Sequence, residues 1–298
     1  MMTTQKSLSP RAWGELALLA LIWGGAFMAT RVVLDDVPVV TLVLHRTFWA
    51  ALVLWAYVFA RGLPLPRDWR IWGAFLVMGI LNNVIPFSLM TWGQLTIESG
   101  LTSILNATTA IFGVLVAALF FSDERLTRRK ALGVALGFSG VTVAIGVSSL
   151  TTFDPRSLAQ LAVLTGTLFY ALASAWARAR LGGVAPQIAA AGMLTASSLI
   201  LLPAAWIIDG PIAFDLSLRT WGAISYLTVI ATAGAFLLYY RVLALAGSGN
   251  LMLVTLLIPP VAITLGAFVL DEALKPQAFI GFALLALGLL VLNGGKKQ

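Results

Sequence analysis

Residues 70–74 of the chain read RIWGA, and 149 positions later residues 219–223 read RTWGA. A second pair keeps almost the same spacing, because DERL at residues 123–126 returns 148 positions later as DEAL at residues 271–274. An internal repeat of this length indicates two related halves, and the fold prediction starts from it.

The composition is that of a membrane protein. Of the 298 residues, 60% are hydrophobic and 10% are charged, whereas a soluble domain carries about 25% charged residues. Apolar stretches of about 20 residues recur along the chain, and each is long enough to cross a hydrocarbon core of about 30 Å. We count ten, at approximately residues 13–35, 38–60, 69–92, 99–121, 129–147, 157–180, 185–207, 219–241, 249–270 and 276–294.

The segments between these stretches are too short to hold a soluble domain. The least distinct boundary is the one between the eighth and ninth spans, which only ALAGS at residues 244–248 separates. The first span is too long for a signal peptide and no small-residue cleavage site follows it, so we expect it to be retained. The chain has no cysteine, which excludes disulfides, thiol nucleophiles and cysteine metal sites.

The basic residues predict the orientation. With ten spans both termini lie on one side, which carries fourteen of the 19 Lys and Arg residues, whereas the other side carries four and Arg46 lies within the second span. The positive-inside rule therefore places both termini in the cytoplasm, in the plasma membrane (the inner membrane of a bacterium). The basic residues are spread over short segments, so the net charge of +7 does not indicate a nucleic-acid-binding face.

Each half contains five spans, an odd number, so the second half enters the membrane inverted relative to the first. The predicted fold is an all-α integral membrane protein of ten transmembrane helices, built from two inverted-topology five-helix repeats, residues 1–150 and 151–298. Many alternating-access transporters have this architecture, with the site where the repeats meet.

The sequence also resembles a known family. The resemblance covers almost the whole chain and rests on Trp23-Gly24 followed by Arg31, on His45-Arg46, on the acidic turns at 123–126 and 271–274, and on Pro259-Pro260 about 13 residues before the second acidic turn's Glu. These features resemble the drug/metabolite transporter superfamily, in its EamA-type ten-helix branch. The first half has Ala-Ile-Phe at residues 110–112 in place of the proline, so a symmetric kink in the fourth span does not follow.

The resemblance implies a secondary transporter that exports small metabolites. Within the branch, the nearest resemblance is to exporters of aromatic and other neutral amino acids. Polar, aromatic and helix-breaking residues at membrane depth are the candidates for lining a substrate site. The candidates are Trp23, Asn82, Asn83, Ser88, Asn106, Thr109, Tyr170, Thr232, Tyr239 and Pro259.

Each group of candidates also has a structural interpretation. Asn82 and Asn83 point about 100° apart on a helix, so one can face a cavity while the other bonds a neighbouring helix. Asn106 and Thr109 share a face, but Thr109 can instead bond its own preceding turn. Pro86 should free the carbonyl of Asn82, and that carbonyl must then meet protein or water.

The aromatic candidates have alternatives as well. Trp23 maps onto Tyr170 in the repeat, and each could bind a substrate or pack in the core. Tyr239 lies near the cytoplasmic end of the eighth span and is either a gate or an interfacial anchor. Pro259, with the proline after it, is expected to break the ninth span and open carbonyls to the interior.

Two further motifs point to structure. Gly133, Gly137 and Gly140 have small counterparts at Gly281 and Gly288, and we expect them to let the fifth and tenth spans pack closely. His45 lies about two turns below the outer surface, where we expect a pair with an aspartate of the 35–36 turn.

The middle of each predicted span contains no Asp or Glu. A proton-coupled pump usually needs such a carboxylate, so we expect uniport or exchange of a neutral or zwitterionic solute. Its carboxylate would be held by Asn side chains or by a broken helix end. No cofactor or metal is expected, and the partners are a small metabolite such as an amino acid and the lipid bilayer. Since the symmetry is internal, a monomer can form the site.

Two other functions were weighed. A membrane channel would show rings of polar residues, usually from an oligomer. A lipid-modifying enzyme within the membrane would need catalytic groups, but the chain has no HExxH, GxSxG, cysteine or deep carboxylate pair. We therefore expect a transporter and no catalytic residues.

Overall fold

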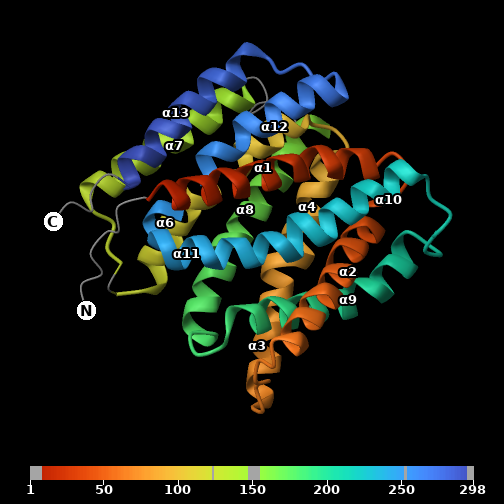
Figure 1. Cartoon of the computed structure of the whole chain (residues 1–298). Coiled ribbons are helices and arrows are strands. Elements are labelled where there is room, and N and C mark those ends of the chain that lie inside the picture. The colour runs from red at the N-terminus through yellow and green to blue at the C-terminus, as the bar shows by residue number, and fades with distance from the viewer. Residues whose placement is uncertain (1–8, 123, 147–154, 252–253, 294–298) are drawn as a thin grey trace.

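The computed structural model describes residues 9–122, 124–146, 155–251 and 254–293 (Figure 1). These residues form ten helical spans, as predicted, five in each half. The first half consists of α1 (Pro10–Val33), α2 (Val39–Ala60), α3 (Trp69–Gly79) with η1 (Ile80–Val84) and α4 (Ile85–Gly93), α5 (Ser99–Asn106) with α6 (Thr109–Phe120), and α7 (Arg128–Ile145). The second half consists of α8 (Pro155–Arg180), α9 (Pro186–Ile208), α10 (Leu218–Ser225) with η3 (Tyr226–Gly234) and α11 (Ala235–Leu251), α12 (Val254–Leu270) and α13 (Pro276–Asn293).

Length and composition suit these helices to a bilayer. Seven spans among the described residues are long and apolar enough to cross a membrane, and α12 and α13 are shorter apolar helices. The remaining span, α7, begins with three basic residues, Arg128, Arg129 and Lys130. The chain is a multi-pass membrane protein of ten helices arranged as two inverted repeats.

Two segments of π-helix occupy equivalent places in the repeat. A shift of 148 residues places η1 within η3, so the third and eighth spans both widen at the same depth. In η1 the reason is local, because Pro86 has no N–H for the carbonyl of Asn82, as predicted. In η3 the Thr232 hydroxyl donates to the carbonyl of Leu227, five residues earlier, at 2.7 Å. Such insertions in α-helices occur frequently at functional sites.

The ninth span differs from the prediction. Pro259 and Pro260 do not break it, because α12 runs without interruption from Val254 to Leu270. Both prolines lie inside the helix, at its sixth and seventh residues, where they remove the amide donors for the carbonyls of Thr255 and Leu256 without ending the helix.

The fourth span is the one that is interrupted, although it contains no proline. It breaks between α5 and α6, where the amide of Thr108 bonds the carbonyl of Leu105 at 3.0 Å. The Thr108 hydroxyl also donates to Leu105 at 2.7 Å, and the Thr109 hydroxyl donates to the carbonyl of Asn106 at 2.8 Å. Hydroxyls that compete for backbone carbonyls in this way disturb a helix.

The predicted boundary at residues 244–248 is also wrong. The helix α11 continues through this segment to Leu251, and α12 begins at Val254. Its residues are small or apolar, and a single glycine within a helix costs only about 1 kcal/mol, so nothing in the segment ends the helix.

The two halves interlock. The most extensive helix pairs all join one half to the other, including α7 with α13, α2 with α9, and α1 with α12. Figure 1 shows α7 and α13 side by side. A Cβ atom on Gly140 would lie 2.6 Å from the carbonyl oxygen of Gly281, and one on Gly288 would lie 2.6 Å from the amide of Gly137. The predicted packing role of these glycines is confirmed.

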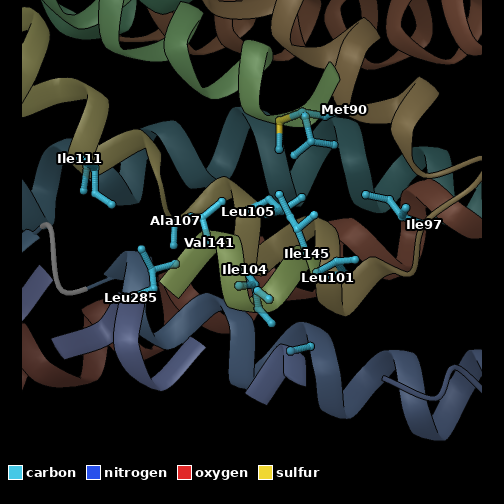
Figure 2. Close-up of a cluster of buried hydrophobic side chains, with 14 of the residues drawn as sticks. Met90, Ile97, Leu101, Ile104, Leu105, Ala107, Ile111, Val141, Ile145 and Leu285 are labelled. Carbon is cyan, nitrogen blue, oxygen red and sulfur yellow. The ribbon is translucent and has the colours of Figure 1, made fainter. Parts of the chain in front are cut away.

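A large apolar core lies beside this pair. Figure 2 shows Met90 of α4, Leu105 of α5, Val141 of α7 and Leu285 of α13 among its members, so both halves contribute. Shape complementarity within this core is what holds the spans in place, because lipid offers an equally apolar environment and gives no hydrophobic driving force between helices.

The acidic turns of the two repeats have different partners. The Glu272 carboxylate accepts hydrogen bonds from the amide of Ser99 at 2.9 Å and from its hydroxyl at 2.9 Å, so it caps α5 of the other half. Glu124 instead pairs with Lys130 at 2.9 Å and lies 3.9 Å from Arg178.

Candidate functional site

Arg46 lies within the membrane-spanning part of α2, about 10 Å along the helix from its N-terminal end. Its Nε donates to the hydroxyl of Thr232 in η3 at 3.1 Å. That hydroxyl gives its own proton to Leu227, so one of its lone pairs is available to the guanidinium. The bond joins the two halves at the π-helix of the eighth span.

Two aromatic rings complete the surroundings of the guanidinium. Arg46 lies over the ring of Phe87 in α4, 4.0 Å from its centroid. Tyr170 of α8 packs edge-on against Phe87 at 6.4 Å and interacts electrostatically with Arg46. We call Arg46, Phe87, Tyr170 and Thr232 the Arg46 cluster.

The charge of Arg46 has no carboxylate partner among the residues that the structure describes. The ion pairs there involve other arginines and lysines. Its side chain is only partly buried, and its two Nη groups form no hydrogen bond with a described residue. A charge at membrane depth without a partner is costly, and such residues usually mark a substrate or ion pathway.

Cavities lie on both sides of Arg46 along α2. One of about 510 Å³ lies toward the end of α2 and is lined by residues that include Tyr57, Gln187, Leu237 and Arg241. Another of about 700 Å³ lies toward the start of α2 and is lined by residues that include Val40 and Ser88. Arg46 lies between these two cavities along α2, and its side chain lines neither of them.

Trp23 and Tyr239 lie next to the cluster. The Trp23 indole donates to the carbonyl of Ala231, adjacent to Thr232, at 3.2 Å, and its ring centroid is 5.8 Å from that of Tyr239. The structure therefore brings four of the sequence candidates, Trp23, Tyr170, Thr232 and Tyr239, into one connected region around Arg46.

Of the two asparagines of η1, Asn83 bonds a neighbouring helix as expected, whereas Asn82 lines neither of the two cavities. Asn83 is fully buried, and its amide donates to the hydroxyl of Ser197 in α9 at 3.0 Å, so it acts as an interhelical clamp. Asn82 is only partly buried, and its amide donates to Asn83 at 3.3 Å and contacts the sulfur of Met193 at 3.7 Å. Neither contacts the Arg46 cluster through a hydrogen bond between described residues.

The remaining candidates are dispersed. Thr109 bonds its own preceding turn, and the side-chain amide of Asn106 is partly exposed, with no hydrogen bond to a described residue. Ser88 lines the cavity near the start of α2. Pro259 is buried in α12. These residues are not joined to the Arg46 cluster.

His45 does not pair with an aspartate, contrary to the prediction. Its Nδ1 accepts from the indole of Trp49 at 3.1 Å, and its ring packs edge-on against Phe214 and Trp221. The two aspartates are engaged elsewhere, Asp35 with Arg31 on the same helix turn and Asp36 with Ser217 and Thr220. The side chain of His45 thus turns away from the neighbouring Arg46.

Sequence reasoning overlooked Arg46 and Phe87 as site residues. Arg46 carried a signal, because it was the one basic residue that fell within a predicted span away from the loops. Phe87 carried none, since phenylalanines are common in the apolar spans.

Comparisons with known proteins identify the family of the chain. The EamA-like transporter family matches the chain twice, over residues 13–146 and 157–294. Curated relatives include Protein PagO of Salmonella typhimurium, 24% identical over 91% of this chain and 89% of that protein. Another is a probable terminal-alkyne amino-acid exporter of Streptantibioticus cattleyicolor, 28% identical over 96% of this chain and 94% of that protein.

A further relative is the uncharacterized inner membrane transporter YedA of Escherichia coli, 22% identical over 95% of this chain and 91% of that protein. The chain also resembles a solved crystal structure with a TM-score of 0.69, covering 96% of this chain and 98% of that one. At 20% identity, this likeness supports the fold alone.

Proposed function

Because this chain belongs to the EamA-like transporter family, we propose that it is an exporter of small metabolites that carry a carboxylate, with aromatic and other neutral amino acids as the first candidates. The observation that carries the proposal is the guanidinium of Arg46, which lies at the junction of the two halves and has no carboxylate partner in the described part of the chain. The relative named as an amino-acid exporter supports the same substrate class.

Arg46 is suited to hold the substrate's carboxylate. A guanidinium offers a planar fork of donors that binds a carboxylate through two parallel hydrogen bonds. One edge of Arg46 is fixed by Thr232, and one face rests on Phe87. The Nη groups, which form no hydrogen bond with a described residue, are the ones that would bind the substrate, while Tyr170 and the nearby Trp23 could contact an apolar side chain.

The proposed mechanism is alternating access. The two cavities on either side of Arg46 would open in turn to the cytoplasm and to the outside as the inverted repeats exchange conformations. The acidic residues lie near the ends of the spans or between them, so proton coupling through a deep carboxylate is absent from this proposal. Uniport or exchange then moves the substrate down its gradient.

The same proposal includes the setting of the protein. We place it in the plasma membrane with both termini in the cytoplasm, because of the distribution of its basic residues. Its partners are the metabolite and the bilayer, with no nucleic acid, and a single chain supplies both repeats. Two of the relatives reported above are named as an exporter and a transporter, which favours a carrier over an enzyme.

Counterflow in proteoliposomes tests the proposal. Vesicles are loaded with unlabelled phenylalanine, threonine or methionine, and uptake of the labelled compound is followed, with lysine and glutamate for comparison. We expect transient accumulation of a neutral amino acid by the wild type and its loss in Arg46→Gln. A matched control is Arg31→Gln, because Arg31 is an exposed arginine of α1 paired with Asp35.

Two results would contradict the proposal. Counterflow that survives in Arg46→Gln, in protein that melts like the wild type, would remove Arg46 from the site. Unitary currents in planar bilayers would instead make the protein a channel.

A further inference from the structure

We propose that the site recognises the carboxylate and the apolar part of its substrate but has no place for an ammonium group. The carrier would then prefer monocarboxylate anions over the corresponding zwitterionic amino acids. This inference rests on the proposed function and narrows its substrate class. It starts from the balance of charges around Arg46.

An ammonium group would find no negative partner at this depth. All twelve Asp and Glu residues lie near the ends of the spans or in the segments between them. On the side of the membrane that carries the termini, the acidic residue that lies furthest inside a span is Glu15. Its carboxylate already pairs with Arg241 at 2.6 Å and with Arg11 at 3.1 Å. The central site therefore carries an unbalanced positive charge.

The groups that face Arg46 from the elements packed against it are neutral. They are the hydroxyl of Thr232 from η3, the ring of Phe87 from α4 and the phenol of Tyr170 from α8. An aromatic face can hold an ammonium group, but the face of Phe87 nearest the site is already covered by the guanidinium. The neighbouring His45 turns to Trp49 and two other rings and offers no charge.

The amino group of a bound amino acid would also lie close to the guanidinium. An α-ammonium is held within a few ångströms of the carboxylate that Arg46 binds. Two positive charges about 6 Å apart at an effective dielectric constant of about 20 disfavour binding by roughly 100-fold. A substrate that lacks the ammonium, such as a 2-oxo acid, avoids this repulsion.

The charge of the substrate then decides how transport responds to voltage. Arg46 returns with the empty carrier, so the net charge moved in one cycle of uniport is that of the substrate. Outward movement of one negative charge is favoured by a membrane potential that is negative inside, by roughly 50-fold for 100 mV. A zwitterion moves no net charge and gains nothing from the potential.

The charges lining the two cavities suit an anion that moves outward. The cavity toward the predicted cytoplasmic end includes Arg241, and the cavity toward the outer end includes Asp35, Asp36 and Asp209. Arg241 is paired with Glu15 at 2.6 Å and Asp35 with Arg31 at 3.0 Å, so among the described residues the unpaired charges are those of Asp36 and Asp209 at the outer cavity, and these weaken rebinding of an anion there.

The experiment compares three probes with the same phenyl ring. Phenylpyruvate is an anion, phenylalanine is a zwitterion and phenethylamine is a cation. Counterflow of each is measured in proteoliposomes, and uptake is repeated with a potential set by potassium and valinomycin. Protein-free liposomes correct for leakage. We expect at least about tenfold higher kcat/KM for phenylpyruvate than for phenylalanine, with no transport of phenethylamine.

The voltage arm and a variant complete the test. A potential that is positive inside should speed phenylpyruvate uptake and leave phenylalanine uptake unchanged. Arg46→Lys, which keeps the charge, should keep the preference for the anion even if its rates fall. In wild-type protein, thermal protection by phenylpyruvate but not by phenethylamine is expected as well.

The outcomes separate the two proposals. Counterflow of phenylalanine with exclusion of phenylpyruvate, or equal kcat/KM for both, overturns this inference and leaves the proposed function standing. Phenylpyruvate uptake that ignores the potential also overturns it. Absence of counterflow with every carboxylate tested, in folded protein, would overturn the proposed function and this inference together.

Discussion

At the scale of single residues, Thr232 fixes the direction of the Arg46 guanidinium. Its hydroxyl accepts from Nε at 3.1 Å and donates to Leu227 at 2.7 Å, so it is itself held in one orientation. We expect Thr232→Val to raise KM by about 10-fold with a smaller change in kcat, because a hydrogen bond to a charged group contributes about 1.5–3 kcal/mol. Counterflow rates at several substrate concentrations give both constants.

The serine variant distinguishes positioning from packing at this residue. Thr232→Ser keeps the hydroxyl and removes only a methyl group, so it should restore a KM near the wild-type value. If the serine and valine variants behave alike, or if kcat falls while KM stays the same, Thr232 does not position Arg46.

At the scale of elements, the pairing of α7 with α13 depends on glycine. A Cβ on Gly140 would approach the backbone of Gly281 and Leu285, and backbone atoms cannot move aside as a flexible side chain can. We expect Gly140→Ala to lower the free energy of unfolding by about 1–3 kcal/mol. Thermal unfolding in detergent micelles, followed by tryptophan fluorescence, measures the loss.

A second glycine provides a matched control for that substitution. Gly113 in α6 has open space where a Cβ would lie. Gly113→Ala should therefore leave the melting temperature unchanged or raise it slightly, because alanine favours a helix over glycine by about 1 kcal/mol. A similar loss of stability in both variants would show that close packing at Gly140 is not the cause of the effect.

The two acidic turns should differ in their contribution to stability. Glu272 satisfies the first amide of α5 across the interface of the halves, whereas Glu124 forms ion pairs in which its own side chain is 40% exposed. We expect Glu272→Ala to cost about 1–2 kcal/mol, as loss of a helix cap does, and Glu124→Ala to cost less than about 1 kcal/mol. Melting curves of the two variants should separate, and a larger loss for Glu124→Ala would contradict the assignment of the cap.

At the scale of the whole molecule, the sequence predicts the spans well and the site only in part. A bilayer imposes length and apolar composition on each span, and both properties are visible along the chain. The contacts of the site are not visible there, because Arg46 and Thr232 are 186 positions apart and Asn83 and Ser197 are 114 apart. The sequence therefore identifies each asparagine as a polar residue at membrane depth, but it does not show whether the side-chain amide is hydrogen-bonded to a neighbouring helix.

Local details of the helices were also hidden from the sequence pattern. Proline generally indicates a break in a helix, yet α12 continues without interruption through Pro259. The break in the fourth span arises instead from threonine hydroxyls that bond the preceding carbonyls. Such competition depends on rotamers that the residue type alone does not determine.

The inverted relation of the halves makes a prediction about the whole molecule that can be tested without a substrate. Leu65 and Ala213 are 148 positions apart, both are exposed, and they follow the equivalent helices α2 and α9. Inversion places them on opposite sides of the membrane. Since the chain has no cysteine, Leu65→Cys and Ala213→Cys each introduce a single thiol.

A maleimide that cannot cross membranes, applied to intact cells, should label Ala213→Cys and spare Leu65→Cys until the cells are permeabilised. We expect this result because the distribution of the basic residues predicts a cytoplasmic location for the segment after α2. Labelling of both thiols in intact cells would contradict the inverted repeat. Labelling of Leu65→Cys alone would be consistent with the inverted repeat but would reverse its orientation in the membrane. The cavity lined by Arg241 would then face the outside. The charges lining the two cavities would in that case favour uptake of an anion and not its export.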